Sequence, residues 1–287
     1  MYNLVMEFTK SLVKGKLIKR YKRFFIDVKL DKEVVIAHCP NTGSMKGLLD
    51  EGNDVYLLPN NDPKRKLKYG LEIIKTRKNL VGVNTHMANR IAQHALENNL
   101  IKELKNSDLI KPEVFFNKET RFDFLIEKNK QKSFVEVKNV TLFRNKDTAE
   151  FPDAVTSRGT KHLLTLIDAI KKGYKSYLIF LVQIQNMEKF KIAKDIDKEY
   201  YNNYLIAKKA GVNFLAYRCD ISSKKIFIIN EKIPKPLIAS NIDPQLIICT
   251  LATQPSHYKT QAWLENKPNV IYYAGSKPSG VEDCADV

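Results

Sequence analysis

The first third of the chain alternates short apolar runs with turn signals, a pattern typical of a small β domain. Between about residues 14 and 83, five apolar runs are separated by clusters of Gly, Asn, Asp and Pro. The runs are "GKLIKRYKRFFIDVKL", "EVVIAHC", "DVYLLP", "LKYGLEIIKT" and "LVGVN". Five strands in so short a segment suggest a five-stranded barrel of the oligonucleotide/oligosaccharide-binding (OB) kind, although periodicity alone does not separate it from other small β folds.

The period of the pattern changes near residue 84. Apolar residues from Met87 to Leu104 recur at three- to five-residue steps behind Asn84 or Thr85 as N-cap, which predicts a helix. Strands follow, then a polar loop to about residue 155, and a second helix with Ser157 as N-cap and Gly173 just past its end. The later segments "SYLIFLVQI", "KEYYNNYLIAKKAG", "NFLAYRC" and "KIFIIN" predict a strand, a helix and two strands. The predicted order, α-β-β-β-α-β-α-β, gives a mixed sheet flanked by helices.

These patterns predict two domains and an extension. We expect an OB-like barrel over residues 1–83, an α/β domain over 84–235, and an appended, loosely ordered or only partly packed extension over 236–287, where amphipathic periodicity is lost. No stretch approaches the roughly 20 apolar residues of a membrane span, and no secretory signal is evident. We therefore expect a cytoplasmic protein without membrane contact. The four cysteines form no C-x-x-C pair, so we interpret them as free thiols.

The net charge of +16 changes the picture, because it indicates an anionic partner such as nucleic acid or a membrane surface. A surface charged for solubility explains the number equally well. Within "KLIKRYKRFF", Tyr21 is surrounded by five basic residues: Lys16, Lys19, Arg20, Lys22 and Arg23. A basic groove with an aromatic side chain suits nucleic-acid backbone contacts and base stacking, whereas part of it could be an ordinary lysine-rich strand edge. The segment "PKRKLK" (63–68) extends this basic surface.

Charged residues also lie inside an otherwise apolar hairpin, "RFDFLIEKNKQKSFVEVKNV" (121–140). Alternate side chains of a strand share a face, so Glu136 and Lys138 point the same way. A turn at Asn129 and Lys130 places Asp123 directly opposite Glu136. Opposed carboxylates about 5 Å apart repel, which either raises one pKa or requires a cation between them.

A divalent cation would meet this requirement. Mg²⁺ takes one or two protein carboxylates and leaves its other positions to water and phosphate oxygens. Lys138 could then position an attacking water or stabilise charge on a phosphate. The other interpretation is a chance E-x-K with Asp123 at an exposed rim, paired with Arg121. Glu113 and Glu119, which flank the hairpin, could add a carboxylate but are better explained as surface residues.

The segment "FPDAVTSRGTKHL" lies just downstream. It brings Arg158, Lys161 and His162 to the first turns of a helix, where backbone N–H groups also favour phosphate. Before any resemblance is considered, solvated side chains explain these residues nearly as well. The other histidines of the first two domains, His38, His86 and His94, are interpreted as structural.

Several segments together resemble the sugar fermentation stimulation protein A (SfsA) family over roughly residues 5–235. They are "LIKRYKRFFIDV", "HCPNTGSMKGLLDEGN", "VGVNTHMANR", "RFDF", "FVEVKNVTL" and "FPDAVTSRGTKHL". The resemblance implies an OB-like N-terminal domain, a C-terminal domain of the PD-(D/E)XK nuclease, or restriction-endonuclease-like, fold, DNA binding, and a role in regulating sugar utilisation. Asp123, Glu136 and Lys138 then match the motif's Asp, acidic residue and Lys, while Phe122 stands where its name has Pro.

We therefore predict a DNA-binding protein with a candidate metal-dependent phosphodiesterase site. Asp123 and Glu136 would hold Mg²⁺ or Mn²⁺, with Lys138 assisting catalysis. DNA contacts with little sequence specificity are assigned to two groups of residues: Lys19, Arg20, Tyr21, Lys22 and Arg23 in the barrel, and Arg158, Lys161 and His162 after the hairpin. The alternative is a catalytically silent regulator that uses the same fold only to hold DNA.

Overall fold

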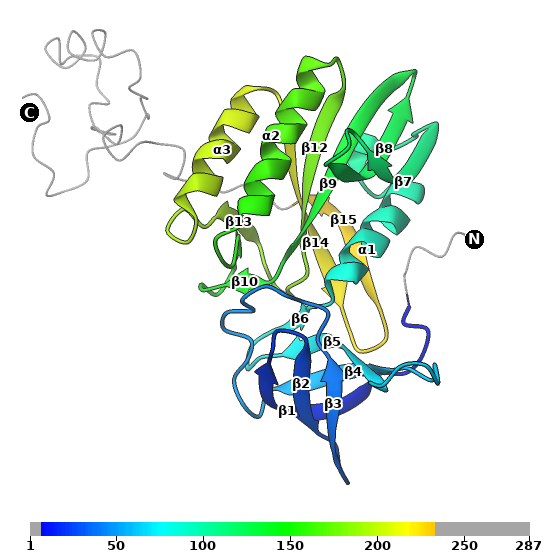
Figure 1. Ribbon diagram of the computed structural model, residues 1–287, viewed down its shortest axis with the longest axis vertical. Helices are drawn as coiled ribbons and strands as arrows, with labels where there is room; N and C mark the ends of the chain where they lie inside the picture. Colours follow the sequence, from blue (N-terminus) through cyan, green and yellow to red (C-terminus); the bar gives the residue numbers. More distant parts are fainter. Residues whose placement is uncertain (1–6, 233–287) are drawn as a thin grey trace, which may run out of the picture. The chain divides into compact units, whose positions relative to one another are not determined.

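The computed structural model describes residues 7–232, and its first part is a β-barrel (Figure 1). Its strands are β1 (Val13–Tyr21), β2 (Phe25–Lys29), β3 (Val34–His38), β4 (Asp54–Pro59), β5 (Tyr69–Lys75) and β6 (Leu80–Gly82). They lie in the order β3-β2-β1-β4-β5-β6, and β3 also pairs with β5, so that β1 to β5 close on themselves. The predicted five-stranded OB-like barrel is confirmed.

The assignment of two of its strands was wrong. The segment "GKLIKRYKRFFIDVKL" forms both β1 and β2, and "LVGVN" forms β6, which pairs with β5 outside the closed set. The hairpin between β1 and β2 turns at Lys22 and Arg23, which both have left-handed backbone, with φ of 47° and 63°. Gly and Asn usually mark such turns, so two basic residues there gave no turn signal.

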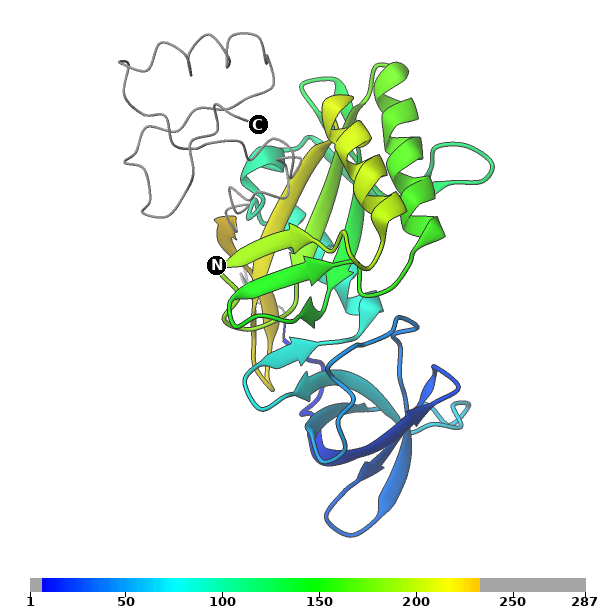
Figure 2. The same ribbon diagram turned by 90° about the vertical axis from the view of Figure 1, so that its left-hand side faces the viewer.

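The second part is built on a six-stranded sheet in the order β15-β14-β12-β9-β8-β7. Its strands are β7 (Leu109–Phe115), β8 (Arg121–Lys128), β9 (Gln131–Val140), β12 (Lys175–Val182), β14 (Asn213–Ile221) and β15 (Ile226–Lys232). Helix α1 (Thr85–Glu97) covers one face, and α2 (Ser157–Lys171) and α3 (Lys198–Lys209) cover the other (Figure 2). β12 pairs parallel with β9 and β14, and the other pairs are antiparallel. The mixed α/β architecture is confirmed, and the predicted helices and strands of this sheet occur in the predicted order, with β10, β11 and β13 added between them.

The helix ends show how local chemistry sets the boundaries. Asn84 caps α1 by accepting a hydrogen bond from the backbone N–H of His86, as predicted, but α1 ends at Glu97, and Lys102–Leu104 forms a separate 3₁₀ helix, η1. The N-cap of α2 is Thr156 rather than Ser157, because the Thr156 hydroxyl accepts from Gly159 N at 3.0 Å. Gly173, with φ of 86°, follows α2 as expected.

The predicted polar loop up to residue 155 was wrong in part, because this region contributes to a second, small sheet. Strands β10 (Leu142–Phe143), β11 (Thr148–Phe151) and β13 (Lys189–Ile192) lie in that order, with β11 parallel to β13 (Figure 2). Glu150 on β11 is buried and bonded by Arg144. Arg144 lies between β10 and β11, and charged residues in and between such short strands have the composition of a loop, which explains the error.

The barrel and the α/β part belong to one compact unit. Gly82 N donates to Gln183 O at 2.9 Å, Ser44 Oγ donates to Asp153 O at 2.8 Å, and Thr85 Oγ1 donates to Pro40 O at 2.7 Å. The predicted domain boundary at residues 83 and 84 falls between β6 and α1. The predicted extension over 236–287 lies outside the described residues.

Cys39 and Cys219 are buried free thiols, whereas Cys249 and Cys284 lie outside the described residues. Among residues 7–232, no helix has the length and apolar character needed to cross a membrane.

Candidate active site

The β8–β9 hairpin positions the charged residues. Phe124 pairs with Val135 and the register continues to Lys128 opposite Gln131, with a turn at Asn129 and Lys130, whose φ values are 50° and 62°. The predicted turn and the register between Phe124 and Lys128 are therefore confirmed, whereas the predicted pairing of Asp123 with Glu136 is not formed. The ladder stops at Phe124 and Val135, one pair before Asp123 and Glu136.

Strand β8 is irregular at Asp123. In β7, Glu113 has left-handed backbone with φ of 55°, and the pairing of β7 with β8 skips from Pro112 opposite Phe124 to Val114 opposite Phe122. Phe122 packs on Phe134, with ring centroids 5.1 Å apart, in the core that contains residues of α2 and α3. Phe124 lies instead in the core beneath α1. The regular alternation of side chains is thus broken at Asp123, although the register of β7 against β8 is the same on both sides of it.

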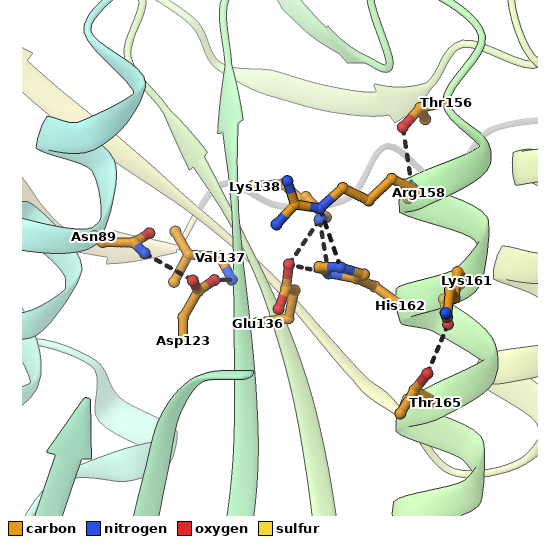
Figure 3. A network of polar contacts seen from close by, with 11 residues as sticks. Asn89, Asp123, Glu136, Val137, Lys138, Thr156, Arg158, Lys161, His162 and Thr165 are labelled. Atoms are coloured by element: carbon orange, nitrogen blue, oxygen red, sulfur yellow. Dashed lines mark hydrogen bonds and ion pairs between the residues drawn. The ribbon is translucent and has the colours of Figure 1, made fainter. Parts of the chain in front are cut away.

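The two carboxylates consequently contact different helices (Figure 3). Asp123 Oδ1 accepts from Asn89 Nδ2 of α1 at 2.7 Å, and Asp123 Oδ2 accepts from Val137 N of β9 at 2.7 Å. Glu136 lies on the α2 side, where its Oε1 contacts His162 Nδ1. Asp123 is half-buried, and Glu136 is only 3% exposed.

Glu136 Oε1 is also the partner of Lys138, whose Nζ lies 2.7 Å away. Lys138 Nζ is 3.3 Å from His162 Nδ1, and Arg158 Nε is 3.5 Å from His162 Nε2, one turn earlier on α2. The structure therefore gathers Glu136, Lys138, His162 and Arg158 on one side of β9, as Figure 3 shows. In contrast, Glu136 Oε2 is buried and has no hydrogen-bond partner among residues 7–232.

The electrostatics of the two carboxylates differ. Burial raises the pKa of Asp123 to about 7, and the negative charge of Glu136 adds to this rise. Burial also acts to raise the pKa of Glu136, but the charges and hydrogen bonds of Lys138 and His162 outweigh it, so that this pKa is below its usual value. Glu136 is thus ionised at neutral pH, whereas Asp123, with a pKa of about 7, is protonated in part of the molecules.

This donor set fits a hard divalent cation. Glu136 Oε2 is an unused buried acceptor, and each Asp123 oxygen keeps a lone pair beyond its one hydrogen bond. The described part of the chain contains no group of three or more His, Cys, Asp or Glu residues placed to hold a metal. Two carboxylates, with water and phosphate oxygens completing the shell, suit Mg²⁺ or Mn²⁺ better than the tetrahedral sites of Zn²⁺.

The other predicted carboxylates and cations near the hairpin are engaged elsewhere. Arg121 pairs with Glu113 at 2.6 Å rather than with Asp123, and Lys161 pairs with Glu119 at 2.8 Å. Both pairs are exposed. Lys161 therefore lies on α2 near the site but is not brought into contact with Lys138 or His162 (Figure 3).

The basic residues of the barrel have different roles. The Arg20 guanidinium donates to the carbonyl oxygens of Arg23, Asn41 and Gly43, so it holds the 41–43 loop. Lys22 and Arg23 are exposed at the hairpin turn.

Lys19 and Tyr21 lie beside this turn. Lys19 Nζ is 3.9 Å from Asp27 and 5.9 Å from the centre of the Tyr21 ring, which in turn stacks on Phe25 at 5.6 Å. Lys22, Arg23 and Tyr21 are thus better placed than Arg20 to contact a ligand.

Of the two groups of predicted DNA-binding residues, only the barrel group lines a cavity, whose volume is about 460 Å³. Its lining includes Arg20 and Arg23 from the barrel and residues 151–156, which lead into α2. Arg158 follows two residues after Thr156, the N-cap of α2. Of the polar residues that surround the site, sequence reasoning missed Asn89, because an amide on an amphipathic helix carries no local signal of its partner.

Comparison with known proteins agrees with this architecture. Residues 18–83 match the family described as "SfsA N-terminal OB domain", and residues 86–225 match "Sugar fermentation stimulation protein RE domain". The sugar fermentation stimulation protein homologue of Pelagibacter ubique is 78% identical over 223 residues, covering 78% of this chain and 96% of that protein. The homologue of Pseudoalteromonas atlantica is 43% identical over 233 residues, covering 80% and 99%.

A solved structure is also similar. The structure of Pyrococcus furiosus SfsA in complex with Ca²⁺ superimposes with a TM-score of 0.74 at 26% sequence identity, covering 80% of this chain and 98% of that one. The matches to both family domains and to full-length relatives show that this chain belongs to the SfsA family, the sugar fermentation stimulation proteins.

Proposed function

We propose that this protein binds DNA and hydrolyses phosphodiester bonds at Asp123 and Glu136 with the help of a divalent cation. The observation that carries the proposal is the buried, unpartnered Oε2 of Glu136, whose other oxygen is held by Lys138. An unpaired buried acceptor costs free energy unless a ligand satisfies it. The raised pKa of Asp123 supports the same view, because a cation between the two carboxylates would relieve both its burial and its repulsion by Glu136.

Each residue has a role that its position supports. Asp123 and Glu136 would bind Mg²⁺ or Mn²⁺, which would polarise the phosphate and lower the pKa of a bound water. Lys138 and His162 fix Glu136 through Oε1 and leave Oε2 for the ligand. Lys138 Nζ, which is mostly buried, supplies positive charge close to where a phosphate would lie.

DNA binding is supported by charge and by the cavity that Arg23 shares with the segment before α2. Lysine and arginine contacts to phosphates carry no sequence information, so we expect little sequence preference. The Ca²⁺ named with the Pyrococcus furiosus structure is consistent with a divalent-cation site in the family. A role in stimulating sugar fermentation rests on the names of the relatives alone. That this role is regulatory and cytoplasmic stays a prediction from the sequence.

The test is a cleavage assay on linear and supercoiled DNA with the purified chain, with Mg²⁺ or Mn²⁺ and with EDTA. We expect metal-dependent cleavage that falls at least about 100-fold in Asp123→Asn and in Glu136→Gln, because each removes one of two charged metal ligands. Glu119→Gln is the matched control, since Glu119 is an exposed carboxylate in the turn before β8. Cleavage that survives both site substitutions would refute the assignment.

The competing function is a DNA-binding regulator without catalysis. It is favoured by the small number of ligands, since no third metal-ligating side chain joins the two carboxylates within residues 7–232. Binding measured by fluorescence anisotropy, in the same variants and without cleavage conditions, separates the two functions. DNA binding with no cleavage at any metal concentration would favour the regulator.

A further inference from the structure

A second and larger cavity lies between the barrel and the start of α1. Its volume is about 930 Å³, within the range of roughly 300–1,000 Å³ common for small-molecule sites. Phe25 of β2 pairs with His38 of β3, and His38 pairs with Gly70 of β5, so these three residues form a row across neighbouring strands. A Cβ atom added at Gly70 would meet no atom within 4 Å. The space above this row is therefore open.

The lining of this cavity is rich in positive charge. Lys10, Arg65, Lys66 and Arg90 line it, and none of the four forms an ion pair with the described residues. Arg65 belongs to the basic segment 63–68, for which the candidate active site has no role.

The N-terminus of α1 adds to this field. Asn84, His86 and Met87 of its first turn line the cavity, and helix N-termini carry partial positive charge. In the part of the chain that the structure describes, the acidic residues of the lining are Glu7 and Glu72 alone. A cavity of this kind favours an anionic ligand.

The cavity also offers flat apolar surface. Phe25 and Tyr69 are only half-buried, and Tyr21 of the basic hairpin stacks on Phe25 with centroids 5.6 Å apart. Polar groups are present beside them, among them Asn60 and the buried Glu72, whose carboxylate accepts from Asn84 Nδ2. Aromatic side chains next to arginines suit a ligand with a planar ring and a phosphate.

We propose that this cavity binds a nucleotide, with its base against Phe25 and Tyr69 and its phosphate near Arg65 and Arg90. If the nucleotide is part of an unpaired DNA strand, this proposal rests on the proposed DNA-binding function. The stack of Tyr21 on Phe25 leads from the hairpin turn at Lys22 into the cavity, so a strand lying on the hairpin would bring a base to it. A free mononucleotide offers the same chemistry from a second source.

The experiment uses the full chain and two probes. The first is a single-stranded oligonucleotide containing one 2-aminopurine, whose fluorescence is quenched when the base stacks. The second is a deoxynucleoside monophosphate, compared by calorimetry with deoxyribose phosphate, which lacks the base. Gly70→Leu fills the cavity without changing charge, Arg65→Ala removes an exposed cation, and Arg77→Ala is the matched control because Arg77 is exposed in the barrel but does not line the cavity.

We expect quenching in the natural protein, at least about tenfold weaker binding in Gly70→Leu, and several-fold weaker binding in Arg65→Ala. The slope of log K against log salt should also fall by up to about one in Arg65→Ala, as for one lost phosphate contact. Arg77→Ala should bind as the natural protein does. A thermal melt of each variant shows whether the fold is kept, and Arg65 lies in an exposed loop, where its replacement is not expected to disturb folding.

The outcomes separate this proposal from the proposed function. Cavity-dependent binding of the mononucleotide without quenching of the oligonucleotide supports the cavity and identifies a free nucleotide as its ligand. DNA binding that Gly70→Leu and Arg65→Ala leave unchanged overturns the cavity proposal and keeps DNA binding. If neither the oligonucleotide nor the mononucleotide binds, the cavity proposal is overturned, whether or not the protein cleaves DNA.

Discussion

Glu72 is a buried carboxyl group whose ionisation should make the protein less stable as pH rises. It lies on β5, is 4% exposed, and accepts from Asn84 Nδ2 at 2.9 and 3.0 Å. Burial raises its pKa from 4.5 to about 7, although the hydrogen bond from Asn84 and the charge of Arg90 oppose the rise. The perturbation to test is Glu72→Gln, which removes the titration and keeps the shape of the side chain.

The sign and size follow from linkage between protonation and folding. Below pH 4.5 the Glu72 carboxyl is protonated in both the native and the unfolded state, so its full contribution to stability is present. Between pH 4.5 and about 7 the unfolded chain loses this proton and the native protein keeps it. The free energy of unfolding therefore falls by about 1.4 kcal/mol per pH unit and levels off above the folded pKa. Between pH 5 and pH 8 the loss attributable to Glu72 is about 2.5 kcal/mol.

The assay is urea unfolding followed by circular dichroism at pH 5, 6, 7 and 8. The free energy of unfolding of Glu72→Gln, minus that of the natural protein, should increase by about 2.5 kcal/mol across this range. An altered hydrogen bond to Asn84 adds only a constant offset, so the pH dependence is the decisive quantity. Glu119→Gln is the control. The hydrogen bond from Lys161, and then its charge, lower the pKa of this exposed carboxylate, so replacing Glu119 cannot produce a gain in relative stability between pH 5 and pH 8. A difference that stays constant from pH 5 to pH 8 would refute the reasoning.

Two further substitutions test the packing. Arg144→Ala leaves the fully buried Glu150 without its main partner, so unfolding in urea should show a loss of about 2–3 kcal/mol. Lys171→Ala, which breaks an exposed ion pair with Asp168, should lower the free energy of unfolding by less than about 0.5 kcal/mol. If Lys171→Ala and Arg144→Ala lost the same stability, burial of the ion pair would not be the cause. Gly15→Ala should cost about 1–3 kcal/mol, because its Cβ would lie 2.4 Å from a neighbouring side chain. At Gly70 an added Cβ would face open space, so Gly70→Ala should leave the free energy of unfolding in urea nearly unchanged. If Gly70→Ala lost as much stability as Gly15→Ala, the steric explanation would be contradicted.

The hairpin could be predicted from the sequence because its information is local. Asn129 marks the turn, the apolar positions on both sides alternate with period two, and the register then follows by counting. The small sheet could not be predicted in this way. Strand β11 pairs in parallel with Lys189–Ile192, about 40 residues later, and such pairing leaves no trace in either segment alone.

The roles of individual polar residues were harder to predict than their elements. Arg20 lies in a basic run, yet its guanidinium binds three backbone carbonyls of the barrel. Asn89 looks like any polar residue of an amphipathic helix, yet it donates to Asp123. Asn41 and Gly43, two of the three partners of Arg20, and Asp123, the partner of Asn89, lie more than 20 residues away in the chain, and only the packed structure brings them together.

The break in the β8–β9 ladder explains why Asp123 can lie in an apolar hairpin. Because regular pairing ends at Phe124 and Val135, the N–H of Val137 is bonded by the Asp123 carboxylate instead. Asp123 thus supplies a backbone acceptor as well as a negative charge. Asparagine keeps one of the two acceptor oxygens, which can serve the Val137 N–H, and removes the charge, whereas alanine removes both oxygens and leaves a buried N–H unpaired. Asp123→Asn is therefore the substitution that isolates the chemistry of the site from the integrity of the sheet.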